Sequence, residues 1–128
     1  MSSPGKTVLI VDDNEDILRS TAAFFRAHGY RVVESSTPLG VTALIQQHVP
    51  NVLVLDLMMP ALNGDALLKL LRRSVASRGL PTVLYSSANE ELLYELSKSV
   101  EGTDYVQKSD GLAVLLDAVQ ARIGDGPA

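Results

Sequence analysis

The chain has 128 residues and no cysteine, which excludes a disulfide framework and a thiolate metal site. Its formal net charge of -4 at pH 7 lacks the basic footprint that nucleic acids and anionic membranes require, so we expect neither as a direct partner. The length fits a single domain over residues 1–128, with a core at about residues 6–123 and a flexible tail at 124–128. No long apolar span or signal-peptide pattern is present, and a cytoplasmic protein is the expectation.

Short segments rich in β-branched and aromatic residues alternate along the chain with segments of helical periodicity. The five predicted strands are Thr7–Val11, Arg31–Ser35, Asn51–Leu55, Thr82–Ser86 and Asp104–Gln107. The five predicted helices carry their apolar residues within Ile17–Phe25, Val41–Ile45, Leu67–Leu71, Leu92–Val100 and Leu112–Ile123. This alternation predicts an α/β fold in which a doubly wound parallel sheet of five strands is flanked by five helices.

Capping residues mark three of the predicted helix starts. The second helix is expected to start at Thr37 and Pro38, because threonine caps a helix and proline fits its first turn. Asn89 is the expected cap of the fourth helix, and Ser109 with Asp110 of the last.

Polar side chains stand where the predicted strands end. In an open α/β sheet the functional crevice lies beyond the carboxyl ends of the strands, so these side chains should converge on one edge. Crowded carboxylates repel one another unless a cation or protons compensate, and oxygen ligands without histidine or thiolate suit Mg²⁺. Asp12 and Asp13 follow the first strand, Asp56 follows the third, Ser86 ends the fourth, and Lys108 follows the fifth.

Each of these residues also has a purely structural interpretation. The run Asp12-Asp13-Asn14 suits the amino end of a helix, and Asp56 suits a turn ahead of Pro60. Ser86 could simply cap or end its strand, and a single lysine such as Lys108 is usually solvated. The shared edge favours the functional interpretation. A phosphoryl group carried by the Asp56 carboxylate would there be neutralised and oriented by the metal, the lysine and the serine hydroxyl.

Four motifs in this order and spacing resemble the receiver domain of bacterial two-component response regulators, from about Lys6 to Ile123. The resemblance implies the strand order 2-1-3-4-5 of the receiver fold. The motifs are VLIVDDN at 8–14, VLVLDLMMPALNG at 52–64, VLYSS at 83–87 and YVQK at 105–108.

The resemblance also implies roles for the acidic residues. Asp56 matches the residue that accepts phosphate from a histidine kinase or phosphotransfer protein. Asp12 and Asp13 match the acidic pair that holds Mg²⁺ or Mn²⁺ together with Asp56, and the backbone carbonyl of Met58 matches a further metal ligand. Such a domain catalyses its own phosphorylation and a slow autodephosphorylation, without being a conventional enzyme.

Three further residues match those through which receiver domains respond to phosphorylation. Lys108 matches the phosphate-pairing lysine, Ser86 the switch hydroxyl, and Tyr105 the aromatic whose rotation accompanies activation. The face formed by the fourth helix, fifth strand and fifth helix is then expected to bind an effector protein or an output domain that the sequence lacks.

The sequence departs from the family pattern at several positions. Ser109 follows the lysine where proline is usual, and this leaves the isomer of the Lys108–Ser109 peptide bond open. Ser87 replaces a small apolar residue. Met58 and Ala88 are apolar and cannot orient an attacking water, so we expect a long-lived aspartyl phosphate.

Two other functional classes are considered. A receiver-like interaction module that works without phosphorylation is disfavoured by the full set of site residues. A flavin carrier of related fold is disfavoured because the paired aspartates would repel a cofactor phosphate and no glycine-rich phosphate loop is present.

Overall fold

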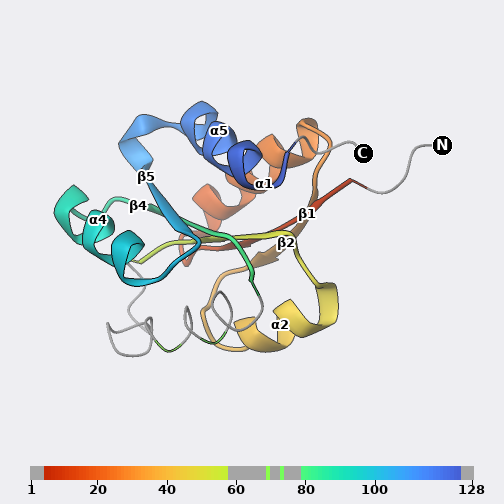
Figure 1. The fold of residues 1–128 in the computed structure, drawn as a ribbon. Helices are drawn as coiled ribbons and strands as arrows, with labels where there is room; N and C mark the ends of the chain where they lie inside the picture. Colours follow the sequence, from red (N-terminus) through yellow and green to blue (C-terminus); the bar gives the residue numbers. More distant parts are fainter. Residues whose placement is uncertain (1–4, 58–68, 70–72, 74–78, 125–128) are drawn as a thin grey trace.

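The computed structural model describes residues 5–57, 69, 73 and 79–124, and Figure 1 shows their arrangement. Strands and helices alternate along most of this part of the chain. In chain order the elements are β1 (Thr7–Val11), α1 (Glu15–Ala27), β2 (Arg31–Ser35), α2 (Val41–His48), β3 (Val52–Leu55), β4 (Thr82–Ser86), α4 (Glu90–Ser99), β5 (Thr103–Gln107), the 3₁₀ turn η2 (Lys108–Asp110) and α5 (Leu112–Ile123).

The five strands form one parallel sheet in the order β2-β1-β3-β4-β5, which confirms the predicted topology. The chain enters the sheet at β1, moves outward to β2, and then crosses to β3 on the other side of β1. The strand order therefore reverses between β1 and β3. The crevice at the carboxyl ends of these two strands is the expected place for a functional site.

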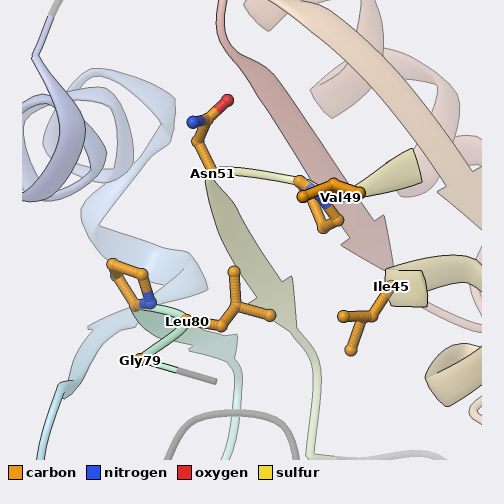
Figure 2. A pocket seen from close by; sticks show the side chains of 7 residues that line it. Ile45, Val49, Asn51, Gly79 and Leu80 are labelled. Carbon is orange, nitrogen blue, oxygen red and sulfur yellow. The ribbon is translucent and has the colours of Figure 1, made fainter. Parts of the chain in front are cut away.

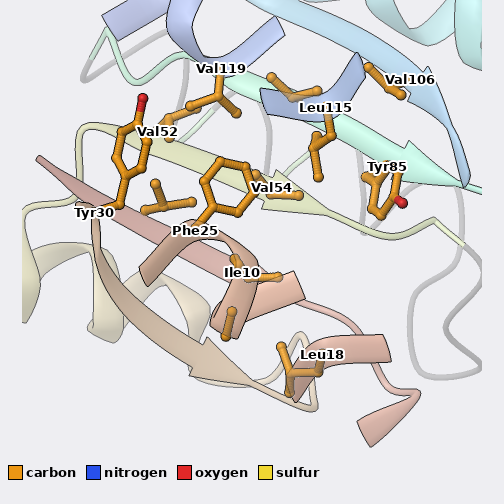
Figure 3. Packing of buried hydrophobic residues seen from close by; sticks show 13 residues of the cluster. Ile10, Leu18, Phe25, Tyr30, Val52, Val54, Tyr85, Val106, Leu115 and Val119 are labelled. Atoms are coloured by element: carbon orange, nitrogen blue, oxygen red, sulfur yellow. The ribbon is translucent and has the colours of Figure 1, made fainter. Parts of the chain in front are cut away.

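Helices cover both faces of the sheet (Figure 1). Helices α1 and α5 pack on one face, where Phe25 and Leu115 are fully buried with Val54 of the sheet (Figure 3). Helices α2 and α4 pack on the other face, where Leu93 is buried with Leu53. All four residues of β3 are buried, as expected for a parallel strand covered on both sides.

The structure corrects two of the predicted helix starts. Helix α2 begins at Val41 rather than at Thr37, because Gly40 has a φ of 81° and the helix cannot extend backwards through a left-handed residue. Thr37 instead accepts a hydrogen bond from the Leu39 N–H within a turn. Helix α5 begins at Leu112 and is preceded by η2.

The cap at Asn89 is confirmed, since its Oδ1 accepts the Leu92 N–H at 3.0 Å. Four α-helices lie in the part of the chain that the structure describes. Of the predicted helix around Leu67–Leu71, the structure describes only residue 69, and the rest falls outside the described residues. None of the described helices is long and apolar enough to cross a membrane.

An apolar hollow lies between the end of α2 and the starts of β3 and β4 (Figure 2). Ile45, Val49 and Leu80 line it. Val49 has a φ of 46°, an unusual conformation for a β-branched residue. This hollow lies at the amino ends of the strands, away from the crevice at their carboxyl ends.

Candidate functional site

Two buried aspartates extend the sheet past the ends of β1 and β3. The Asp12 N–H donates to the Ser35 carbonyl at 3.1 Å, and the Asp56 N–H donates to the Val11 carbonyl at 3.0 Å. The backbone ladder thus holds both residues at the point where the strand order reverses. Asp12 is 3% exposed and Asp56 is 4% exposed, so neither carboxylate is an ordinary surface group.

Asp12, Asp13 and Asp56 form a cluster in which one oxygen from each carboxylate lies within 4.8 Å of the others. Asp13 is exposed, which leaves one side of the cluster open to solvent. Three carboxylates and one nearby lysine leave an excess of negative charge. The donor set is purely oxygen, and it fits a hard divalent cation such as Mg²⁺. Met58, whose carbonyl was predicted as a further ligand, lies outside the described residues.

Lys108 places its ammonium between the two buried carboxylates. Its Nζ lies 2.8 Å from Asp12 Oδ2 and 3.1 Å from Asp56 Oδ2. Although burial opposes its charge, the hydrogen bonds and Coulomb attraction of the two aspartates raise the pKa of Lys108 above its ordinary value. The lysine therefore stays charged at neutral pH.

Burial raises the pKa of Asp12, and the nearby Asp56 carboxylate adds to this. Hydrogen bonds from Lys108 and from the Asn14 N–H act in the opposite direction but do not outweigh burial. The pKa of Asp12 and the pKa of Lys108 are thus both raised. This is consistent, because Lys108 is stabilised by two carboxylates, whereas Asp12 shares a single ammonium with Asp56. An additional cation would stabilise the ionised form of Asp12.

Ser86 ends β4 and is fully buried. Its Oγ accepts the Ala88 N–H at 3.1 Å, so the hydroxyl organises the first residues of the loop that leads to α4. Its partner in the β4–β5 register is Gln107, which directly precedes Lys108. The sheet therefore places the serine at the same edge as the lysine.

Tyr105 lies on β5 with its ring half-buried against the core on the α2 and α4 side. Its hydroxyl donates to Glu90 Oε2 at 3.3 Å, in the first turn of α4. Burial first, and then the charge and hydrogen bond of Glu90, raise the pKa of Tyr105. The tyrosine thus connects β5 to the start of α4.

The Lys108–Ser109 peptide bond is trans, as are the other peptide bonds of the described residues. Sequence reasoning assigned no role to Gln107, and it placed Asn14 only within the run that suits the start of a helix. Asn14 caps α1 by accepting the Asp16 and Ile17 N–H groups at 3.1 Å each, a role signalled by asparagine ahead of two acids. Gln107 bonds across to the loop after β4, for which the sequence holds no signal.

The profile of the response regulator receiver domain family matches residues 8–120. The chain is 30% identical to the phosphate regulon transcriptional regulatory protein PhoB of Pseudomonas aeruginosa, over 95% of this chain and 55% of that protein. It is 26% identical to the protein PilH of the same species, over 89% of this chain and 94% of PilH. The chain thus spans about half of some curated relatives and nearly all of others.

A solved structure, the receiver domain of the Francisella response regulator 1452, superposes with a TM-score of 0.77 at 29% identity, covering 91% of this chain and 94% of that one. The arrangement of the elements is therefore that of a solved receiver domain.

Proposed function

Because the chain belongs to the family of response regulator receiver domains, we propose that it accepts a phosphoryl group on Asp56 and signals by changing the surface that it offers to a partner. The observation that carries this proposal is the buried carboxylate of Asp56 with the Lys108 ammonium 3.1 Å away. A buried acid beside a fixed cation is a suitable acceptor for an anionic group, because phosphoryl transfer depends largely on positioning and charge stabilisation.

Asp12, Asp13 and Asp56 would hold Mg²⁺ or Mn²⁺, with the Met58 carbonyl as a further ligand. When bound, the ion neutralises negative charge on the transferred group and on the carboxylates. The cluster of three carboxylate oxygens supports this assignment.

The proposed donor is a phosphohistidine of a histidine kinase or a phosphotransfer protein. An oxygen of Asp56 attacks the phosphorus, the new O–P bond forms, and the P–N bond breaks with its electron pair returning to the imidazole. Lys108 pairs with an oxygen of the arriving group. This requires the ammonium to shift only within the site, since it already contacts the acceptor carboxylate.

The proposed response begins at Ser86. Its hydroxyl turns to donate to the phosphoryl group while its oxygen keeps the Ala88 N–H that it now accepts, so the loop after β4 is drawn along with the serine. Tyr105 then exchanges its contact with Glu90 for an inward position, and the face formed by α4, β5 and α5 changes shape. We propose that an effector protein or an output domain recognises this face.

Phosphorylation is tested by incubating the protein with Mg²⁺ and a small-molecule phosphodonor and measuring intact mass. We expect the mass to rise by one phosphoryl group, and we expect Asp56→Asn to abolish the increase because it removes the nucleophilic oxygen. Asp117→Asn is the matched control, since Asp117 is an exposed acid on α5 away from the site. A wild-type protein that stays unmodified would contradict the proposal and favour a module that works without phosphorylation.

The same preparation tests the persistence of the phosphoryl group. Ala88 is apolar and buried, and Met58 is also apolar. Neither residue has a side chain that could orient an attacking water. Slow autodephosphorylation follows. Loss of the phosphoryl group within seconds in the absence of a phosphatase would contradict this part of the proposal.

A further inference from the structure

The side chain of Gln107 joins the turn that carries Lys108 to the loop that follows Ser86. Its Nε2 donates to the Ala88 carbonyl at 3.3 Å. Its carboxamide oxygen accepts the Asp110 N–H, and Asp110 Oδ2 accepts the Gln107 N–H at 3.3 Å in return. The orientation of the carboxamide is determined by its partners, because one is a carbonyl and the other is an N–H.

Ala88 is consequently held from both of its backbone groups. Its N–H donates to Ser86 Oγ at 3.1 Å, and its carbonyl accepts from Gln107. Ala88 is 4% exposed, and a hydrogen bond lost in a buried place is not readily replaced by water. When the loop between β4 and α4 moves, either these two hydrogen bonds break or the side chains of Ser86 and Gln107 move with the loop.

The other end of this connection is the acidic site. Gln107 directly precedes Lys108, whose Nζ contacts both Asp12 and Asp56. The reciprocal bonds between Gln107 and Asp110 close the 3₁₀ turn in which Lys108 is the first residue. A change in the position of the lysine backbone is thereby coupled to the carboxamide that holds the loop.

We propose that Gln107 is a positioning residue that makes the Lys108 turn and the Ser86 loop move as one unit. The inference rests on the proposed function and deepens it, since it assigns a physical link between the phosphate-pairing lysine and the switch hydroxyl. When Ser86 turns toward the phosphoryl group, the loop shifts with Ala88, and Gln107 passes that shift to the turn of Lys108.

A simple capping role for Gln107 would need only its acceptor oxygen. Gln107→Glu keeps an oxygen for the Asp110 N–H but removes the donor to Ala88. Gln107→Met has a similar length and removes both. Comparison of these two variants therefore separates the link to the loop from the closure of the turn.

The first measurement is amide hydrogen exchange in the unphosphorylated protein. In Gln107→Met the Asp110 N–H loses its acceptor, and the loop that carries the Ala88 N–H loses the bond at the Ala88 carbonyl. We expect exchange at both amides to accelerate by about two- to ten-fold, the range for loss of one hydrogen bond. In Gln107→Glu we expect acceleration at Ala88 alone. Gln46→Met, at an exposed position on α2, is the matched control and should leave both rates unchanged.

The second measurement is the response of amide chemical shifts to Mg²⁺ with beryllofluoride. In Gln107→Met we expect the shift changes next to Asp56 to persist, because the acceptor and Lys108 remain. The changes at Glu90 and Tyr105 should fall by about twofold or more, because the loop no longer moves with the turn.

Wild-type exchange at Ala88 in both Gln107 variants would overturn the inference, as would a full response at Glu90 and Tyr105 in Gln107→Met. A wild-type protein that does not respond to beryllofluoride would contradict the proposed function. The exchange rates would still decide whether Gln107 holds the loop.

Discussion

Lys108 would compete with the proposed divalent cation for the same carboxylate oxygens. Its ammonium lies 2.8 Å from Asp12 Oδ2 and 3.1 Å from Asp56 Oδ2, and its pKa is raised, so it remains charged throughout the neutral range. Like charges a few ångströms apart repel by several kcal/mol in a partly buried site, before screening. The lysine is therefore expected to weaken cation binding while it assists the transfer of an anion.

Lys108→Met tests this balance at the scale of one residue. Removal of the ammonium should tighten Mg²⁺ binding by on the order of tenfold, because repulsion is lost and both carboxylates are freed. It should at the same time slow phosphorylation of Asp56. Calorimetric titration with Mg²⁺ measures the first effect, and intact mass measures the second.

Lys98→Met is the control for the lysine experiment, because Lys98 is an exposed lysine on α4 outside the acidic cluster. Equal or weaker Mg²⁺ binding in Lys108→Met would show that the lysine does not compete for the carboxylates.

At the scale of elements, side chains of β5 connect this edge strand to the helices on either side. Tyr105 donates to Glu90 in the first turn of α4, and Asp104 forms a two-point ion pair with Arg122 of α5. The second contact raises the pKa of Arg122 through its hydrogen bond to Asp104. A shift of β5 would therefore strain or break contacts to both α4 and α5, the helices of the proposed signalling face.

Glu90→Gln tests the connection between β5 and α4. Loss of the negative charge should lower the pKa of Tyr105 toward its ordinary value, because burial remains while the contribution of Glu90 is removed. Since the folded-state pKa is raised, the stabilisation from this contact is present below the ordinary tyrosine pKa and is lost as the pH rises through the folded value. Titration of the tyrosine ring by NMR measures the shift.

Glu91→Gln is the matched control for this titration, because Glu91 occupies the same first turn of α4 and is exposed. An unchanged titration of Tyr105 in Glu90→Gln would show that the hydroxyl does not depend on this carboxylate in solution.

At the scale of the whole molecule, two apolar layers share one sheet. Phe25 of α1 is fully buried against the sheet and contacts Tyr30 in an edge-to-face arrangement with ring centroids 5.5 Å apart. Its layer also includes Leu115 and Val119 of α5 (Figure 3). Helix α1, which follows the acidic pair, and helix α5, which follows the lysine turn, are thus packed into one layer.

Phe25→Ala should lower the free energy of unfolding by about 3–5 kcal/mol, because a large cavity forms in this shared layer. Phe24→Ala is the matched control, since the neighbouring ring is only half-buried and should cost less. Urea unfolding followed by circular dichroism measures both. Equal losses for the two variants would mean that α1 does not depend on this layer as the structure indicates.

Much of the fold and of the acidic edge followed from sequence alone, for reasons visible at particular residues. The apolar run of β3 predicts a strand covered on both faces, and parallel strands bring their carboxyl ends to one edge, where Asp12 and Asp56 directly follow. The start of α2 was not predictable in the same way. It depends on the left-handed conformation of Gly40, which threonine and proline upstream do not reveal.

The sequence by itself determined which residues share an edge, because that depends on local periodicity and on a short list of allowed connections. Tertiary structure alone decided which atoms meet there. The bridge from Lys108 to two aspartates and the bonds of Gln107 to Ala88 and Asp110 depend on strand register and side-chain direction. Most of these contacts join residues distant in the chain, and only the packed sheet places such atoms within hydrogen-bonding distance.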